Sequence, residues 1–451
     1  MRFAIIIVLI MVCGPLALFI GIPSVKYLGL IGLVYGLIDI YLVRSKKGHL
    51  YVGRLLNRRQ SAVLAIVVGQ YMVSFLRIQS GEFSLIGNLN LAIQVLFIVL
   101  LTYGTVSRSR TGFEDGGKQL IYQLYWALSM VIVINVGGSL LGFEAPIPDG
   151  GPPPDKDASP SLIAGLLGLD LGRTGFFLTG HPNGFGIYVG WVFIMGVLLL
   201  IYGKYENLQK QYIRFSVAAI IFALLMLDSR NTTASSIVCI LLAITLVRIR
   251  ITQLAPYLTW ILPILSLSIT VLLQYIASSG AAASVSRADG EIATGNGRTI
   301  FWEYCMEELS VFKEIHLFGW GQNGHITSGV ALKYEWYLDY PAYTHNFVFQ
   351  TIVDMGYLGL LSLLWLMYIV SKNGSLLVRK GYKQFIVFAV FPIYFQLSGI
   401  FEATFGQFNQ PYTNTFLLMA GLSVFLMNEC MISQKNQFQA PLDPLSSVNK
   451  D

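Results

Sequence analysis

Long apolar runs separated by short polar stretches extend over most of the chain. Most runs are about 17–25 residues long, the length that crosses a ~30 Å hydrocarbon core as a helix. Apolar and polar positions do not alternate, as they would in the strands of a membrane barrel. Because backbone polar groups in lipid must be bonded internally, the pattern predicts an all-α polytopic membrane protein. The twelve predicted spans lie at about residues 3–20, 27–43, 61–77, 86–105, 119–139, 184–203, 215–228, 233–247, 258–277, 346–370, 385–401 and 413–428.

Composition and charge agree with this fold class. Hydrophobic residues make up 55% of the chain and charged residues only 12%, whereas soluble domains carry about a quarter charged residues. With the N-terminus in the cytoplasm, 21 of the 30 Lys and Arg residues fall in cytoplasmic loops and tails. This positive-inside distribution predicts that both termini are cytoplasmic. It also accounts for the net charge of +6, which therefore gives no indication of nucleic-acid binding.

The cysteines and the first apolar run add no further chemistry. Cys13, Cys239, Cys305 and Cys430 are scattered and form no CxxC pair, so neither a disulfide framework nor a metal–thiolate site is predicted. The first run lacks a clear small-x-small cleavage site. We therefore interpret it as a retained helix rather than a secretory signal.

Two long segments between spans are predicted to lie at the outer face. Residues 140–183 are first Pro/Gly-rich and then apolar but broken by glycines, which suits a re-entrant or interfacial element. Residues 278–345 form the largest soluble part of the chain. The predicted organisation is N-terminal spans at 1–139, the first outer loop at 140–183, central spans at 184–277, the second outer loop at 278–345, C-terminal spans at 346–428 and a cytoplasmic tail at 429–451.

The second outer loop contains one predicted helix, TIFWEYCMEELSVFK at 299–313. Its apolar residues recur at helical spacing on one side, and three glutamates occupy another. This pattern predicts an amphipathic helix that lies on the membrane surface or caps the bundle. The apolar side consists of Phe301, Cys305, Leu309 and Phe312.

Three arginines lie on the outer side, where basic residues are scarce: Arg173, Arg230 and Arg298. Arg230 occupies a short connection between two spans, and an ionisable group there usually marks a functional site. Arg298 precedes the amphipathic helix, at the end where free N–H groups attract anions. Guanidinium groups suit phosphate oxygens, so the three arginines indicate an anionic ligand. The structural alternatives are an Arg230–Asp228 pair and a contact of Arg298 with lipid headgroups.

A polar stripe begins where the second outer loop enters a span, in PAYTHNFVFQTIVDMG at 341–356. His345 stands at the entrance, and Asn346, Gln350 and Asp354 follow at intervals of four. A carboxyl group at the depth of Asp354 must face the bundle interior. On a continuous helix Gly356 returns to nearly the face of His345 and leaves a gap for a helix or a lipid chain. The alternative is that His345 is a hydrogen-bonded structural histidine.

The remaining outer candidates are weaker. His181 lies in a predicted turn, TGHPNGFG, and His316 and His325 flank a glycine turn, LFGWGQNG. Asp155 and Asp157 form a DxD sequence of the kind that holds a metal in some glycosyltransferases. Such matches are common by chance and this one lies in a proline-rich loop, so we assign no metal and no cofactor.

With these residues the chain resembles the O-antigen polymerase and O-antigen ligase superfamily, the Wzy- and WaaL-type membrane glycosyltransferases. The resemblance covers roughly residues 170–370. It is carried by Arg173 with GHPNGFG, SRNTTAS around Arg230, GRTIFW at 297–302, FGWGQNG at 318–324 and THNFVFQTIVDMG at 344–356. The family's histidine–x10–glycine spacing is present as His345 and Gly356, whereas Arg173 and Arg298 lack its arginine–glycine spacing of fifteen residues.

The resemblance implies a GT-C-like fold and a metal-independent, inverting glycosyl transfer at the outer face of the bacterial plasma membrane. The donor is a glycan on polyprenyl pyrophosphate. The implied catalytic residues are His345, as general base, and Arg298 and Arg230, which balance the charge of the leaving pyrophosphate. The expected substrate-binding residues are Arg173, His181, Asn183, Asn346, Gln350 and Gly356.

We therefore expect a polysaccharide polymerase that joins lipid-linked repeat units. The alternative is a ligase that moves the glycan to a lipid A core or a similar acceptor. A transporter or flippase for lipid-linked sugars is a third possibility, but it should carry charged or broken helices at the midplane and internal repeats. The expected partners are the bilayer and the lipid-linked donor and acceptor, with a chain-length regulator and a flippase as candidate protein partners.

Overall fold

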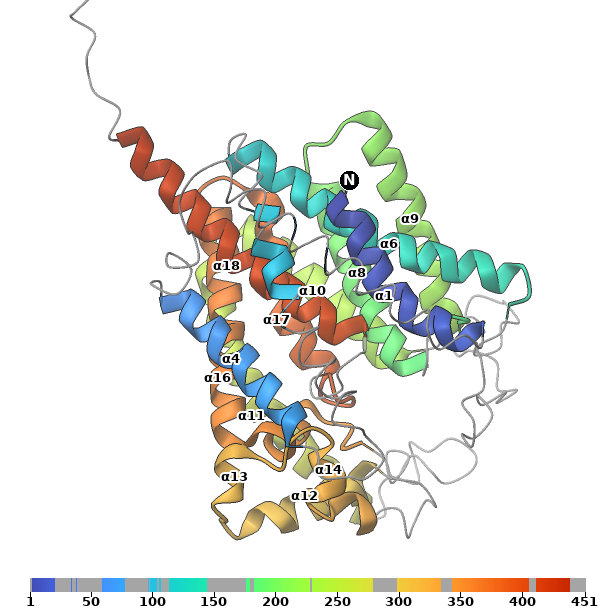
Figure 1. The fold of residues 1–451 in the computed structure, drawn as a ribbon, viewed down its shortest axis with the longest axis vertical. Helices are drawn as coiled ribbons and strands as arrows, with labels where there is room; N and C mark the ends of the chain where they lie inside the picture. The colour runs from blue at the N-terminus through green and yellow to red at the C-terminus, as the bar shows by residue number, and fades with distance from the viewer. Residues whose placement is uncertain are drawn as a thin grey trace, which may run out of the picture.

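The fold is known from a computed structural model, which describes the greater part of the chain (Figure 1). Within the described ranges the chain is helical and contains no strand. These ranges are residues 2–20, 34, 38, 59–77, 96, 98–103, 105–106, 113–143, 176–178, 182–227, 229–278, 298–333, 343–404 and 411–438.

Ten of the described helices form one bundle, and three others gather at its lower end in Figure 1. The bundle helices are α1 (Arg2–Phe19), α4 (Arg59–Leu76), α6 (Phe113–Leu140), α8 (Pro182–Tyr202), α9 (Asn207–Leu227), α10 (Arg230–Arg248), α11 (Ala255–Ser278), α16 (Phe347–Arg379), α17 (Ile386–Ser398) and α18 (Pro411–Phe438). The helices at the lower end are α12 (Arg298–Ser310), α13 (Ile315–Phe318) and α14 (Gly324–Thr327).

Seven of the described helices are long and apolar enough to cross a membrane, and two shorter apolar helices accompany them. The all-α polytopic fold predicted from the apolar runs is therefore confirmed, and the chain is a multi-pass membrane protein. Of the twelve predicted spans, 27–43 and 86–105 fall largely outside the described residues.

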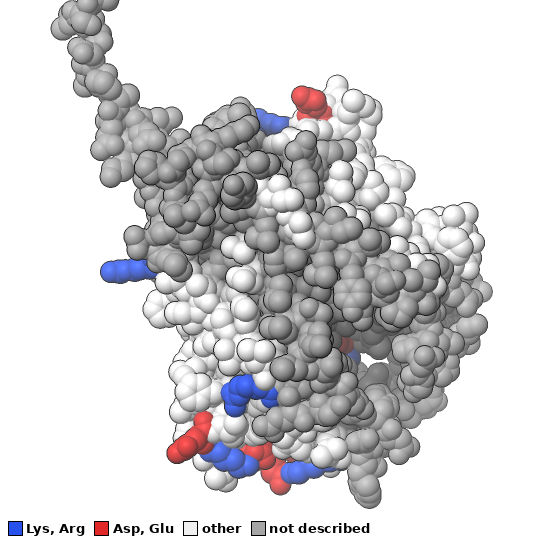
Figure 2. Space-filling model, viewed as in Figure 1, with Lys and Arg blue, Asp and Glu red and all other residues white. Residues whose placement is uncertain are grey.

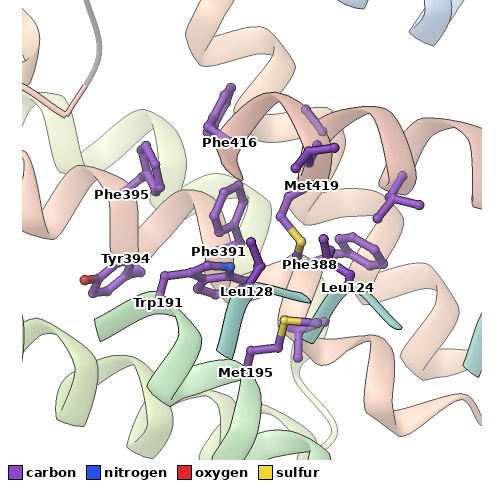
Figure 3. Close-up of a cluster of buried hydrophobic side chains, with 14 of the residues drawn as sticks. Leu124, Leu128, Trp191, Met195, Phe388, Phe391, Tyr394, Phe395, Phe416 and Met419 are labelled. Atoms are coloured by element: carbon purple, nitrogen blue, oxygen red, sulfur yellow. The ribbon is translucent and has the colours of Figure 1, made fainter. Parts of the chain in front are cut away.

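The centre of the bundle is an aromatic core built by α8, α17 and α18 (Figure 3). The ring centroids of Trp191 and Phe391 lie 4.4 Å apart, and those of Phe391 and Phe416 lie 5.6 Å apart. All three side chains are fully buried. Gly190 lets α8 approach its neighbours, because a Cβ atom there would come within 2.4 Å of Tyr394 and of Thr232. Close packing of this kind holds membrane helices together where the hydrophobic effect does not.

The lower end of the molecule, around α12, has a small core of its own. Phe301, Trp302 and Cys305 of α12 are buried against Phe349 at the start of α16. Charged side chains gather on the surface of this end (Figure 2). The predicted helix is present as α12, which packs its buried residues against the start of α16, with one correction: α12 ends at Ser310, and Phe312 beyond it is 62% exposed.

Helix α16 is interrupted at Gly356, where φ is +73° and ψ is −177°. At this break the Val353 carbonyl accepts a hydrogen bond from the Trp320 amide (2.8 Å), and the Asp354 carbonyl accepts one from Gly321 (3.0 Å). A Cβ atom at residue 356 would lie 2.3 Å from the Leu317 carbonyl oxygen, so only glycine fits. The prediction of a continuous helix from His345 to Gly356 is therefore wrong. The backbone of α13 and of the turn after it fills the gap that was expected beside Gly356.

Candidate functional site

Three segments far apart in the sequence meet at the α12 end: the first turn of α12, residues 343–346 before α16, and residues 399–404 after α17. The Trp302 indole donates to the Thr344 carbonyl (2.8 Å), and the Phe347 amide donates to the Gly399 carbonyl (2.8 Å). These bonds bring the residue types needed for acid–base and anion chemistry to one place.

Glu402 joins Arg298 and His345 into one cluster. Its Oε1 lies 2.7 Å from Arg298 Nη2, and its Oε2 lies 3.4 Å from His345 Nδ1. The side chains are 16% (Glu402), 20% (Arg298) and 27% (His345) exposed, so all three are partly buried yet reachable. A carboxylate at Nδ1 holds an imidazole in the tautomer whose Nε2 can accept a proton. The cluster therefore combines a cation and an oriented base.

The backbone at His345 is unusual, because its φ of +48° lies in the left-handed region that residues other than glycine rarely adopt. Such conformations gather at functional sites, where the surrounding contacts enforce them. His345 is not part of the helix. The helix begins after Asn346, which caps it by accepting hydrogen bonds from the amides of Val348 (2.9 Å) and Phe349 (3.3 Å).

The predicted polar stripe lies inside the protein. Asn346 is fully buried, and its amide nitrogen donates to Ser266 of α11 and to the Ile400 carbonyl. Gln350 and Asp354 are buried below it and bonded to each other. As predicted, Asp354 faces the interior. In this arrangement the side chains of Asn346 and Gln350 bond to protein groups around His345.

Arg230 is the first residue of α10, and its side chain is exposed. The next residue, Asn231, donates a hydrogen bond to the Ser398 carbonyl at the end of α17 (2.9 Å), four residues before Glu402. Arg230 thus lies at the same end of the bundle as Arg298 and His345. Arg173 and His181 lie outside the described residues, as does the side chain of Asn183 at the start of α8.

His316 and His325 are both buried. Burial, with a smaller contribution from His345 nearby, lowers the pKa of His325 to about 3, so this imidazole is neutral at physiological pH. The centroid of its ring lies 4.7 Å from that of Tyr343, with the two ring planes tilted by 45°. Among the residues that the structure describes, no group of three or more His, Cys, Asp or Glu is arranged to hold a metal. Asp155 and Asp157 lie outside that part of the chain.

Glu402 was missed by the sequence analysis. A weak signal exists, because Glu402 is the sole acidic residue between Asp354 and Glu429 and follows an apolar run directly. An isolated carboxylate at the end of a membrane span needs a partner. Nothing in the sequence identifies that partner as a histidine 57 positions away.

In a comparison with protein families, residues 215–364 fit the model of the family described as O-antigen ligase. This match, over about a third of the chain, supports membership of the O-antigen polymerase and ligase superfamily. The matched region runs from α9 into α16 and includes Arg230, Arg298 and His345, whereas Glu402 lies beyond it. Members of this family are glycosyltransferase-like enzymes. A comparison with curated proteins gives no match.

Proposed function

We propose that the protein is a polysaccharide polymerase of the bacterial plasma membrane, with the α12 end at the outer face and both termini in the cytoplasm. It joins repeat units carried on polyprenyl pyrophosphate. The observation that carries the proposal is the Arg298–Glu402–His345 cluster, which is partly exposed at the end of the bundle. The match to the O-antigen ligase family model supports it.

His345 is the general base in this proposal. The acceptor sugar's hydroxyl oxygen attacks the anomeric carbon of the donor and gives its proton to Nε2 of His345. The bond from the anomeric carbon to the pyrophosphate oxygen breaks, and attack from the opposite face inverts the configuration. Glu402, at Nδ1, orients the ring and stabilises the imidazolium that forms. A positioned base of this kind contributes about 10²–10⁴-fold to the rate.

Arg298 and Arg230 stabilise the charge that develops on the leaving lipid pyrophosphate. The Glu402 ion pair engages Nη2 of Arg298 and fixes the direction of the guanidinium group. A guanidinium group carries five N–H donors, so this pair leaves further donors for phosphate oxygens. Preorganised cations act strongly because they need no rearrangement during the reaction. Arg173 and His181 of the first outer loop complete the proposed donor site together with Asn183.

A ligase is the second candidate, because the matched family model is described as O-antigen ligase. It would use the same base and cations and differ only in the acceptor, a lipid A core or a similar anchor. The chemistry at the anomeric carbon would be unchanged.

The test is to incubate the purified protein with a single lipid-linked repeat unit and no other acceptor. A ladder of lengthening glycans is the result expected for a polymerase. Transfer that occurs only after lipid A core is added would identify a ligase. If the donor is unchanged with either acceptor, while a vesicle assay shows it crossing the bilayer, the protein is a transporter and the proposal is wrong.

A further inference from the structure

Gln350 is a fully buried side chain whose amide bonds to three different groups. Its Oε1 accepts a hydrogen bond from the Thr344 amide (3.2 Å). Its Nε2 lies 3.0 Å from each carboxylate oxygen of Asp354 and 3.2 Å from Nδ1 of His325. A primary amide nitrogen carries two hydrogens, so one serves Asp354 and the other serves His325. Both atoms of the Gln350 amide group are therefore engaged.

These bonds tie together three segments of the α12 end. Asp354 also accepts a hydrogen bond from the Gly324 amide (2.8 Å), which attaches the start of α14 to the break in α16. The contact is tight, because a Cβ atom at Gly324 would lie 2.1 Å from the Val353 carbonyl oxygen. Thr344 belongs to the loop before α16. One side chain thus connects that loop, the first half of α16 and the α14 turn.

The loop that Gln350 holds is the one that carries His345. Thr344 is fixed on both sides, since Gln350 binds its amide and the Trp302 indole binds its carbonyl. Asn346, the residue after His345, is fixed by the helix cap and by Ser266. The left-handed backbone of His345 lies between these two anchored residues. Loss of the bond to Thr344 removes one of the two anchors on that residue, and we expect the strained backbone of His345 then to relax and shift the imidazole relative to Glu402.

We propose that Gln350 is a positioning residue: its amide holds the loop before α16 so that the His345 imidazole stays aligned between Glu402 and the acceptor. This inference rests on the proposed function, in which His345 is the base. Gln350 does not touch the substrate, because its side chain is fully buried and its amide is engaged by protein groups.

The test is a double-mutant cycle with Gln350→Met and His345→Ala, measured as transfer from a polyprenyl-pyrophosphate-linked repeat unit. Methionine keeps the volume of glutamine, but its sulfur is only a weak acceptor for the Thr344 amide and it has no N–H to donate to the partners of Nε2. We expect kcat to fall about 10–100-fold, because a displacement of about 1 Å at a reacting group has effects of this size. The KM for the donor should stay within about threefold of the parent value, since the arginines that bind it are untouched.

The decisive result is the effect of Gln350→Met in the His345→Ala background. A residue that acts through His345 has no further effect on the rate once the imidazole is gone. If Gln350→Met lowers the rate by the same factor in both backgrounds, raises KM alone or has no effect, the positioning role is wrong. Should Gln350→Met not fold, Gln350→Asn, which is one methylene too short to hold Thr344, takes its place in the same cycle.

Gln396→Met is a matched control. Gln396 is also a buried glutamine, and its amide nitrogen donates to the Thr259 carbonyl and to the sulfur of Met367, outside the network of Gln350. It should lower thermal stability but leave kcat per folded molecule near the parent value. The two proposals fail separately: full activity of His345→Ala refutes the proposed base, whereas a slow His345→Ala with a fully active Gln350→Met refutes only the role of Gln350.

Discussion

The aromatic core and the α12 end of the same bundle are built in opposite ways. In the core, Trp191, Phe391 and Phe416 interlock by shape on regular helices. At the α12 end, directional hydrogen bonds hold irregular backbone in place, and four of the six described glycines with positive φ lie between residues 319 and 356, together with Asn323 and His345. Shape packing fixes where helices lie, whereas only directional bonds fix where a single imidazole points. Under the proposed function, the core provides stability and the α12 end carries the reacting groups.

The largest effect should come from removing a cation at the α12 end. Arg298→Ala should abolish transfer, with a loss of at least about 10²–10³-fold, because the pyrophosphate charge loses a preorganised donor and Glu402 loses its partner. Arg298→Lys should restore only part of the rate, since an ammonium group cannot form the two-pronged contact. Arg230→Ala should be similarly inactive. Thermal stability in detergent should change little. Near-normal activity of both Ala variants would show that the arginines do not bind the pyrophosphate.

A substitution in the aromatic core should have the opposite effect, a loss of stability with little change in the transfer rate. Phe391→Ala removes a buried ring between Trp191 and Phe416 and should lower the free energy of unfolding by about 3–5 kcal/mol. The protein that remains folded should transfer sugars at nearly the parent rate. Thermal unfolding in detergent, together with the rate per folded molecule, measures both quantities. A variant of normal stability and low activity would contradict the division between core and site.

A smaller, pH-dependent effect should come from His325. Its pKa is lowered to about 3 in the folded protein, while an unfolded histidine titrates near 6.5. As the pH falls below 6.5, the unfolded state takes up the proton first, so stability is lost on acidification. Between pH 6.5 and pH 5 this loss is at most about 2 kcal/mol. The thermal midpoint of His325→Gln should therefore fall less over this range than that of the parent; an equal fall would show that His325 is not the group responsible.

The smallest effect expected is that of metal removal. The proposed mechanism assigns the role of a metal to arginines, so incubation with EDTA should leave the transfer rate unchanged. If activity is lost on chelation and returns with magnesium or manganese, Asp155 and Asp157 become the first residues to mutate.

The sequence predicted most of the helices, because hydropathy alone decides whether a segment can cross a membrane. It could not predict the break in α16, since glycine is common in membrane helices and the residues on both sides of Gly356 continue the apolar pattern. The break can be recognised only in the structure, where backbone amides of the turn at 319–324 donate hydrogen bonds to the α16 carbonyls beside the break.

The site was predictable in part. Arg298 and His345 were identified from their chemistry and outer placement, and the structure brings them together. Glu402, which joins them, was not, because the contact depends on how α17 ends beside the start of α16. Gln350 and Asn346 were recognised as polar but expected to face a substrate. Helical periodicity and depth in the membrane show that a polar side chain must have hydrogen-bond partners. They do not show whether those partners belong to the protein or to a ligand.

The most direct test of the account is the behaviour of His345 in a single-turnover reaction with a labelled lipid-linked donor. His345→Gln keeps a polar side chain at the loop but cannot take a proton. The account predicts that it binds the donor as the parent does, through the arginines, and transfers sugar about 10²–10⁴-fold more slowly. Near-normal turnover of His345→Gln would contradict the account and reduce His345 to a residue that shapes the loop.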